Sequence, residues 1–424
     1  MKKFIILSIL GMVFNQANAE RYEYLSRPTG KYSVAVAQYH LINPNICPDY
    51  YYESKDNWFY QNDSRHCHKL NLYIYYPTLD KSGKYLSYFS NDIQQIKLDI
   101  KNNVIESINI TYANNYINQE SKVTSYVLDS GLIANHQFPL IIFSPGMSIN
   151  SYYYQNFIAN IVSNGYIVAS IDSAYNQTIY DQEKSNFLAA ANPVFESGIS
   201  SIWKARSNLD IASLDINYVV NIMRKSNLKS PILNHVDFNN IGGIGHSLGG
   251  RAIYNFSREN NTPFKASVAM EIGRDKTLLQ NKSVKIPFLF INAANMSISD
   301  KEYFGDYSKF ELGVNNYLVR MSPSENNSAY SSHVTFTDYS TLRYNDRLNK
   351  LYNLAYNQKF SESDYNQWYG TVDGFNFTND VNNYLVSFFD YYLKHKSSKM
   401  FTTCKPINQN SLLYCGENKG VVIN

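Results

Sequence analysis

The run GHSLGG, from Gly245 to Gly250, constrains the fold of this chain more than any other feature. It has the spacing of a sharp strand-to-helix turn, in which glycines two positions before and two after a serine leave room for the backbone. The surrounding residues agree, because 238–244 predict a short strand and 251–256 predict a helix with an apolar face. Ser247 at the apex is therefore a candidate nucleophile. The alternative is a glycine-rich connection in another parallel α/β sheet.

Strands and helices alternate along most of the chain after residue 138. Uninterrupted apolar runs are typical of parallel strands buried on both faces, and they occur at 138–144, 166–171, 266–270, 287–292 and 316–321. Helices are expected at 151–163 and 202–223, and earlier strands at 32–38 and 70–76, the second ending before Pro77. The order predicts an α/β fold with a mostly parallel central sheet and helices on both faces.

The first residues have the three parts of a secretory signal peptide. Lys2 and Lys3 precede an apolar run at 4–14, and the small residues Ala17 and Ala19 follow. We expect cleavage after Ala19 and a secreted or periplasmic protein. The apolar run is shorter than the roughly 20 residues of a membrane span, so no transmembrane segment is predicted.

Four cysteines form two close pairs along the chain, Cys47 with Cys67 and Cys404 with Cys415. Exported proteins commonly join such neighbours as disulfides, so two local disulfides are predicted. The alternative for the first pair is a metal site, because His66 and His68 flank Cys67. That run lacks the spaced second half of a zinc site.

The balance of charge makes nucleic acid an unsuitable partner. Removal of residues 1–19 leaves 36 basic and 35 acidic side chains, a formal charge of +1. The length favours one catalytic domain over 20–424 with added segments. We expect N-terminal strands plus an irregular insertion (81–129) within 20–130, a core over 131–396, and a disulfide-closed tail over 397–424.

Seven further clues are the segments at 28–32, 75–78, 138–147, 165–171, 245–250, 288–292 and 333–338. Taken in order, these segments resemble the platelet-activating factor acetylhydrolase family of α/β-hydrolases, in its plasma and intracellular type II branch. The resemblance implies an α/β-hydrolase fold with an N-terminal extension, and a serine ester hydrolase acting on short or modified acyl chains of phospholipids. It implies neither a metal nor an organic cofactor.

A serine nucleophile needs a base within hydrogen-bond reach and a carboxylate that orients the base. In this fold the order along the chain is serine, acid, histidine. Two histidines follow Ser247, namely His333 and His395. His395 lies at the lysine-flanked end of a predicted amphipathic helix, where a solvated histidine is favourable. His333 follows the last predicted buried strand and is the predicted base.

Three carboxylates compete for the role of acid. Glu271 directly follows the strand at 266–270, and the resemblance places the family's acid there, although the family more often has aspartate. Asp300 follows the next strand, where many other α/β-hydrolases keep their acid, and Asp275 is a third candidate. Glu271 is the predicted acid. The alternative for each carboxylate is a surface position beside a helix start.

Two backbone N–H groups are predicted to stabilise the oxyanion of the reaction. One belongs to Leu248, directly after the nucleophile, and the other to Met147, where Gly146 lets the loop turn closely. The family usually has Ser-His-Gly where this chain has Ser-Pro-Gly at 144–146. Main-chain donors tolerate that difference.

These residues predict an exported serine ester hydrolase that forms an acyl-enzyme on Ser247. Within the same fold the alternatives are another carboxylesterase, a polyesterase or a peptidase. The alternative from a different class is a noncatalytic binding protein that retained the fold. Residues 174–200 are expected to form either an apolar flap above the site or a packed surface loop. The sequence does not predict an oligomeric state.

Overall fold

The structure is a computed structural model, and it describes the chain in several separate ranges. They are 25–46, 52–54, 57–58, 67–121, 123–174, 176–177, 179–181, 186–188, 208–272, 284–293, 315–321, 329–343, 346–357, 361–408 and 411–415. The predicted signal peptide and most of the segment 174–200 lie outside the described residues.

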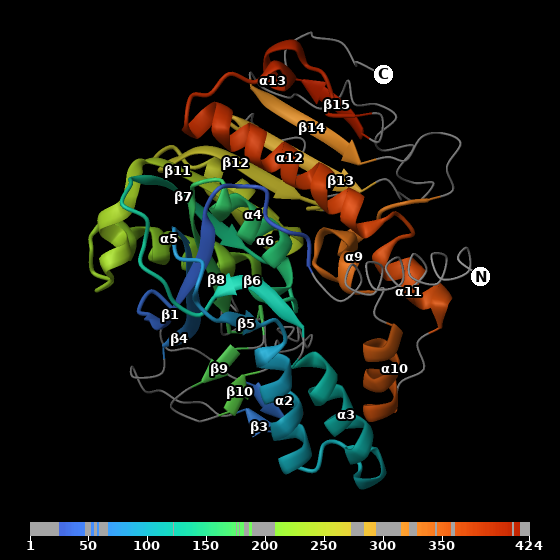
Figure 1. Ribbon diagram of the computed structural model, residues 1–424. Coiled ribbons are helices and arrows are strands. Elements are labelled where there is room, and N and C mark those ends of the chain that lie inside the picture. Colours follow the sequence, from blue (N-terminus) through green and yellow to red (C-terminus); the bar gives the residue numbers. More distant parts are fainter. Residues whose placement is uncertain are drawn as a thin grey trace, which may run out of the picture.

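The described chain forms an eleven-stranded central sheet in the order β15-β14-β13-β12-β11-β7-β8-β4-β1-β6-β5 (Figure 1). Its strands are β1 (Ser33–Asn43), β4 (His68–Thr78), β5 (Tyr85–Ser87), β6 (Thr124–Leu128), β7 (Phe138–Ser144), β8 (Ile167–Ser173), β11 (Val236–His246), β12 (Phe264–Met270), β13 (Phe288–Ala293), β14 (Asn316–Met321) and β15 (Ser411–Cys415). The neighbours from β8 to β14 are parallel. Strands β4, β1 and β15 are added antiparallel. Two short pairs, β2 (Tyr52–Ser54) with β3 (Asn57–Trp58) and β9 (Ile179–Asp181) with β10 (Asn186–Leu188), lie outside this sheet.

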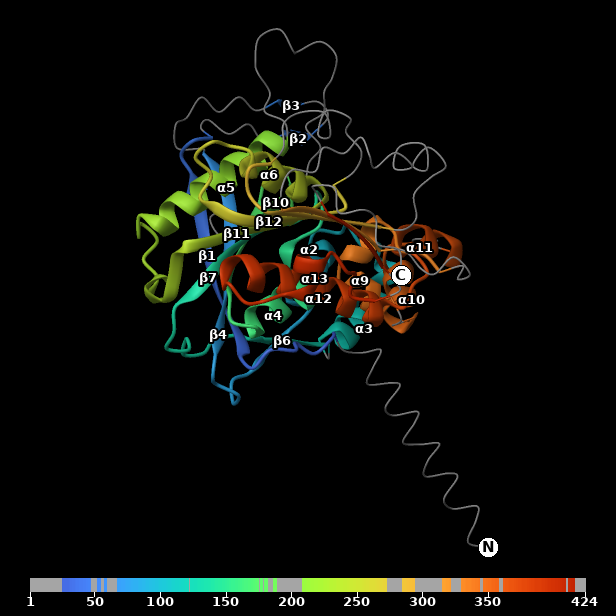
Figure 2. The same cartoon turned by 90° about the horizontal axis from the view of Figure 1, so that it is seen from above.

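Helices cover both faces of the sheet (Figure 2). On one face, α4 (Gln155–Ser163) and α12 (Gly374–Leu393) share an apolar core with the strands. On the other face, α5 (Asn208–Arg224) and α6 (Ser247–Ser257) do the same. Further helical segments are α2 (Ser90–Lys101), η1 (Ser107–Asn109), α3 (Ile110–Glu120), η2 (Ser151–Tyr154), η3 (Pro231–His235), η5 (His333–Phe336), α9 (Tyr339–Leu342), α10 (Asp346–Ala355), α11 (Glu362–Tyr369) and α13 (Lys399–Thr403). This arrangement confirms the predicted α/β-hydrolase fold.

Strand β4 continues past the proline that was expected to end it. It runs to Thr78, and Pro77 pairs in register with Val34 of β1. On its other side β4 pairs with β8 only between Leu70 and Tyr75. Beyond Tyr75 that side of β4 meets residues 133–134, through a bridge between Thr78 and Ile133 and a hydrogen bond from the Ala134 N–H to the Pro77 carbonyl. A residue without an N–H group fits beside such an irregular partner.

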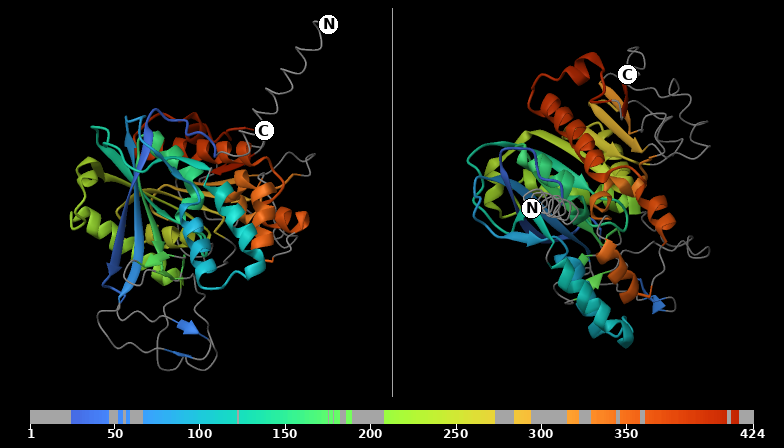
Figure 3. Two further views of the ribbon diagram at one scale, coloured as in Figure 1. Left: turned by 60° about the horizontal axis from the view of Figure 1, so that its bottom comes forward. Right: turned by 45° about the vertical axis from the view of Figure 1, so that its right-hand side comes forward.

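The insertion at 81–129, whose sequence pattern is polar and irregular, contains the helices α2 and α3 and the strands β5 and β6. Ile93, Ile96 and Ile100 recur at helical spacing along α2 and belong to an apolar cluster of their own. Leu342 and Ala355 join the same cluster from the C-terminal half. Figure 3 shows α2 and α3 beside α10, so the insertion packs on the segment that follows His333.

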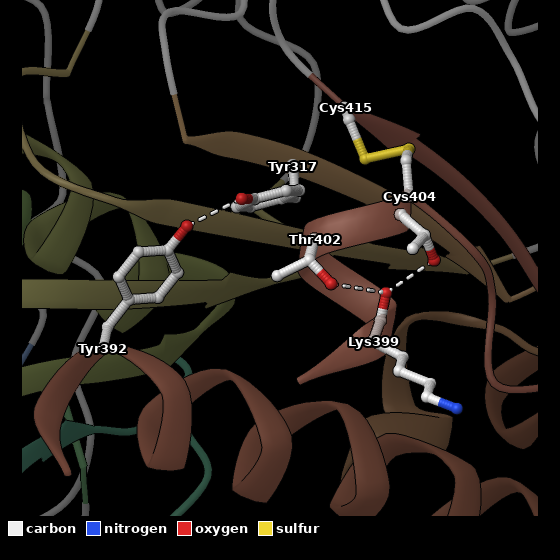
Figure 4. Close-up of a disulfide and its surroundings, with 7 residues drawn as sticks. Tyr317, Tyr392, Lys399, Thr402, Cys404 and Cys415 are labelled. Atoms are coloured by element: carbon white, nitrogen blue, oxygen red, sulfur yellow. Dashed lines mark hydrogen bonds between the residues drawn. A yellow bond between two sulfur atoms is a disulfide. The ribbon is translucent and has the colours of Figure 1, made fainter. Parts of the chain in front are cut away.

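A disulfide closes the tail of the described chain, as the sequence predicts. Cys404, directly after α13, is bonded to Cys415 at the end of β15 (Figure 4). Cys67 is also disulfide-bonded, whereas Cys47 lies outside the described residues. Its pairing with Cys67 therefore stays a prediction. The His68 ring lies 3.1 Å from a carboxylate oxygen of Asp215, and the described chain contains no cluster of metal-ligating side chains.

We expect the double substitution Cys404→Ser, Cys415→Ser to loosen the tail, because the disulfide restricts an unfolded loop with a sequence separation of 11. Chain entropy puts the effect at about 2 to 3 kcal/mol. Hydrogen exchange of the β15 and β14 amides measures it. The wild-type protein in reducing agent is the control and should match the variant. Unchanged exchange in β15 would contradict the expectation.

Candidate active site

The turn between β11 and α6 holds Ser247 in a strained backbone conformation. Its φ of 52° lies in the left-handed region that side chains other than glycine rarely adopt. A Cβ atom at Gly249 would lie 2.1 Å from the carbonyl oxygen of Ser144, and one at Gly245 would lie 2.5 Å from the backbone of Gly249. Glycine is therefore required at Gly249 by the close approach of the turn to the end of β7, and at Gly245 by the tightness of the turn itself.

The structure brings the predicted base to the predicted nucleophile. His333 begins η5, after β14, and its Nε2 lies 2.9 Å from Oγ of Ser247. His395 lies elsewhere, just beyond the end of α12. Its neighbour Lys394 donates to the carbonyl of Asn164, which precedes β8 at the amino edge of the parallel strands. Ser247 follows the carboxyl end of β11, so His395 lies at the opposite edge of the sheet.

The surroundings of His333 favour a neutral imidazole. Removal of water from around the ring lowers its pKa below the ordinary value of 6.5, and the positive charge of Arg251 on α6 lowers it further. The guanidinium of Arg251 is itself fixed by donation from Nε to the Ile272 carbonyl, at 2.6 Å. A neutral ring with Nε2 facing a hydroxyl is the form that accepts a proton.

The predicted acid lies at the end of β12 and faces the neighbouring strand. Glu271 has a φ of 48°, and its carboxylate accepts a hydrogen bond from the N–H of Ala293 at the end of β13. In the described part of the chain no carboxylate is hydrogen-bonded to His333. Asp275 and Asp300 lie outside the described residues, so the identity of the acid stays a prediction.

The loop after β7 is anchored by two consecutive residues that follow β8. Ser148 donates its N–H to the Asn176 carbonyl at 2.6 Å, and the Gln177 side chain donates to the Gly146 carbonyl at 2.9 Å. Within the described residues the Met147 N–H donates to no backbone acceptor, and the Leu248 N–H lies in the first turn of α6, where no carbonyl of the helix can accept it. These two backbone donors are the ones that the sequence predicts for an oxyanion hole.

Two fully buried side chains that the sequence analysis did not single out connect these parts. His246, directly before the nucleophile, lies with Nδ1 2.8 Å from the hydroxyl of Tyr154 and Nε2 3.0 Å from the backbone carbonyl of His333. The Tyr154 hydroxyl accepts the N–H of Gly146 at 3.1 Å. Burial lowers the pKa of His246 well below its usual value. A signal was present in the sequence, because His246 lies within the GHSLGG run.

Two buried aspartates hold the elements that carry the loops. Asp172, at the end of β8, accepts the N–H of Ser151, and Asp338, five residues after His333, accepts the N–H groups of Gln155 and Asn156 at the start of α4. Burial raises the pKa of Asp172 to about 6 and that of Asp338 to about 7. The sequence analysis missed both, since their partners are backbone groups distant along the chain.

Comparison with known proteins places this chain by its fold alone. No family model matches it, and no curated protein matches its sequence. A solved structure that it resembles is a ferulic acid esterase from Streptomyces cinnamoneus, with a TM-score of 0.61 and 17% identity, covering 92% of this chain and 98% of the esterase. Among the described residues no helix is long and apolar enough to cross a membrane. The chain has the α/β-hydrolase fold, and its site residues lie at the carboxyl edge of the parallel strands.

Proposed function

We propose that the protein is a serine ester hydrolase. The observation that carries the proposal is the 2.9 Å contact between His333 Nε2 and Ser247 Oγ at a strained strand-to-helix turn. The backbone N–H groups of Leu248 and Met147 next to that turn supply donors for a developing negative charge. The likeness in fold to an esterase supports the same reaction class.

The reaction follows from this geometry. Ser247 Oγ attacks the ester carbonyl while His333 Nε2 takes its proton, and the resulting oxyanion accepts hydrogen bonds from Leu248 and Met147. The tetrahedral intermediate collapses, and the alcohol leaves with the proton from His333. Water then attacks the acyl group on Ser247, with His333 again as the base, and the carboxylic acid is released. Glu271 is the proposed acid that orients His333.

The proposed substrates are short or modified acyl esters, such as the sn-2 esters of phospholipids. This choice rests on the resemblance to the platelet-activating factor acetylhydrolases, carried by the ordered segments from 28–32 to 333–338. The signal-peptide pattern at 1–19 and the disulfide-bonded cysteines favour a secreted or periplasmic location. Other carboxylic esters and polyesters fit the same mechanism.

We expect Ser247→Ala to abolish hydrolysis of p-nitrophenyl acetate, butyrate and octanoate, because no nucleophile remains. Loss of a serine nucleophile costs on the order of 10⁶ in kcat. Labelling by a fluorophosphonate probe should disappear as well, with thermal unfolding unchanged. Ser257→Ala is the matched control, since Ser257 ends α6 away from the turn. An inactive wild-type protein would favour the noncatalytic binding protein, and full labelling of folded Ser247→Ala would refute the assignment.

Substitution of the acid candidates tests the third member of the site. If Glu271 orients His333, then Glu271→Gln should lower kcat by roughly 10⁴, because the imidazolium loses its charged partner. Asp300→Asn should then leave kcat within a factor of about three. The reverse order of effects would assign the acid to Asp300. Glu271→Asp, which shortens the side chain by one methylene, should retain partial activity.

The pH dependence of kcat/KM should depend on Arg251. In the wild-type protein the active form of His333 is neutral, so activity rises with pH through a pKa below the ordinary 6.5. Arg251→Gln removes a positive charge that disfavours the imidazolium, so the pKa rises and the acidic limb moves to higher pH. Arg251→Lys keeps the charge and should leave the limb near its original position. Equal profiles for the two variants would contradict this account.

A further inference from the structure

A continuous hydrogen-bonded chain crosses the buried side of the candidate site. It runs from the Gly146 N–H to the Tyr154 hydroxyl, from there to the His246 ring, and from the ring to the backbone carbonyl of His333, over distances of 3.1, 2.8 and 3.0 Å. Tyr154 and His246 are both fully buried. The chain therefore joins the loop after β7, the turn at Ser247 and the segment of the base without using water.

The last acceptor of this hydrogen-bonded series determines which atom donates at each of its contacts. The His333 carbonyl only accepts, so Nε2 of His246 must carry a proton. In the neutral ring Nδ1 is then an acceptor, and the Tyr154 hydroxyl must donate to it. The hydroxyl oxygen stays free to accept from Gly146. A single tautomer satisfies all three contacts.

Protonation of His246 would break this arrangement. Both ring nitrogens would then donate, and the proton of the fully buried Tyr154 hydroxyl would lose its acceptor. The titratable groups that face the ring are Tyr154 from η2 and His333 from η5, whose ring centroid lies 4.6 Å away. A second positive charge beside His333 would also oppose the imidazolium that the reaction forms.

We infer that His246 is a positioning residue for the proposed reaction, acting as a neutral ring protonated on Nε2. It fixes the His333 backbone against the turn, so that the His333 ring reaches Ser247. Through Tyr154 it also fixes Gly146, directly before the proposed oxyanion donor Met147. The His246 ring thereby holds the base and the loop after β7 at a fixed distance from each other. This inference rests on the proposed function for its catalytic consequence, but not for the tautomer.

Tyr154→Phe removes one hydroxyl and tests the connection to the oxyanion loop. We expect kcat on p-nitrophenyl butyrate to fall about 10- to 100-fold with KM within about threefold, because misplacement of catalytic groups acts on the transition state. Tyr166→Phe is the matched control. Tyr166 is also fully buried and donates to Asp390 at 2.7 Å, at the amino edge of the sheet. It should lose stability but keep its kcat. Equal kcat values for the two variants would overturn the inference.

Two replacements of the His246 ring separate the effect of its hydrogen bonds on kcat from the effect of its volume. Glutamine at this position offers an N–H near the place of Nε2, whereas methionine has similar length and no donor. We expect His246→Gln to retain at least about tenfold more kcat than His246→Met. Fluorophosphonate labelling rates should follow the same order. Equal activity of the two folded variants would show that the ring only fills space.

A spectroscopic measurement tests the tautomer without activity. In protein labelled with ¹⁵N histidine, His246 should show a protonated Nε2 and an unprotonated Nδ1 at the ordinary histidine pKa of 6.5 and above, with no titration in this range. Spectra of His246→Gln and His333→Gln assign the two rings. A protonated Nδ1, or titration in this range, would overturn the inference. A wild-type protein without esterase activity would instead refute the proposed function, and the tautomer would still be decided.

Discussion

The contact between Gly249 and the carbonyl of Ser144 is the constraint on which the site depends. Strands β7 and β11 are parallel neighbours, so their carboxyl ends meet at one edge of the sheet. A side chain as small as alanine at Gly249 would place its Cβ 2.1 Å from that carbonyl oxygen. The helix that begins at Ser247 thus starts directly against the loop that carries Met147. Backbone packing thus limits the distance between Ser247 and the loop after β7, and the side chains of His246 and Tyr154 hold the loop in place.

The base needs a different kind of support, because it arrives from a segment 86 residues further along the chain. Two buried groups supply it. His246 holds the carbonyl of His333, and Asp338 holds the start of α4 through two backbone N–H groups. Asp338 also accepts from the hydroxyl of Tyr88 in the insertion, at 3.0 Å. The helical insertion is therefore connected to the site through the same carboxylate.

Residue spacing and the order of residues along the chain predicted part of the candidate site. Glycine spacing located Ser247, and chain order left two histidines, of which His333 reaches it. The helices at 81–129 were not predicted, because their apolar residues are sparse and the residues they pack against lie in the C-terminal half. The network through His246 and Tyr154 was not predictable from spacing, since it joins residues 92 positions apart. The sequence does not assign the acid for a related reason. Whether a carboxylate after a strand end reaches His333 depends on the path of the loop that carries it.

Burial shifts the titratable groups around Ser247 toward their neutral forms. It lowers the pKa of His246 and His333, and it raises that of Asp172 and Asp338 to about 6 and about 7. The proposed reaction adds an oxyanion and an imidazolium to a site where Arg251 is already a positive charge beside His333. Preset N–H donors stabilise a developing oxyanion without reorganising during the reaction. In the proposed reaction the polar network of this site supplies orientation, and the N–H groups of Met147 and Leu248 supply the electrostatic stabilisation.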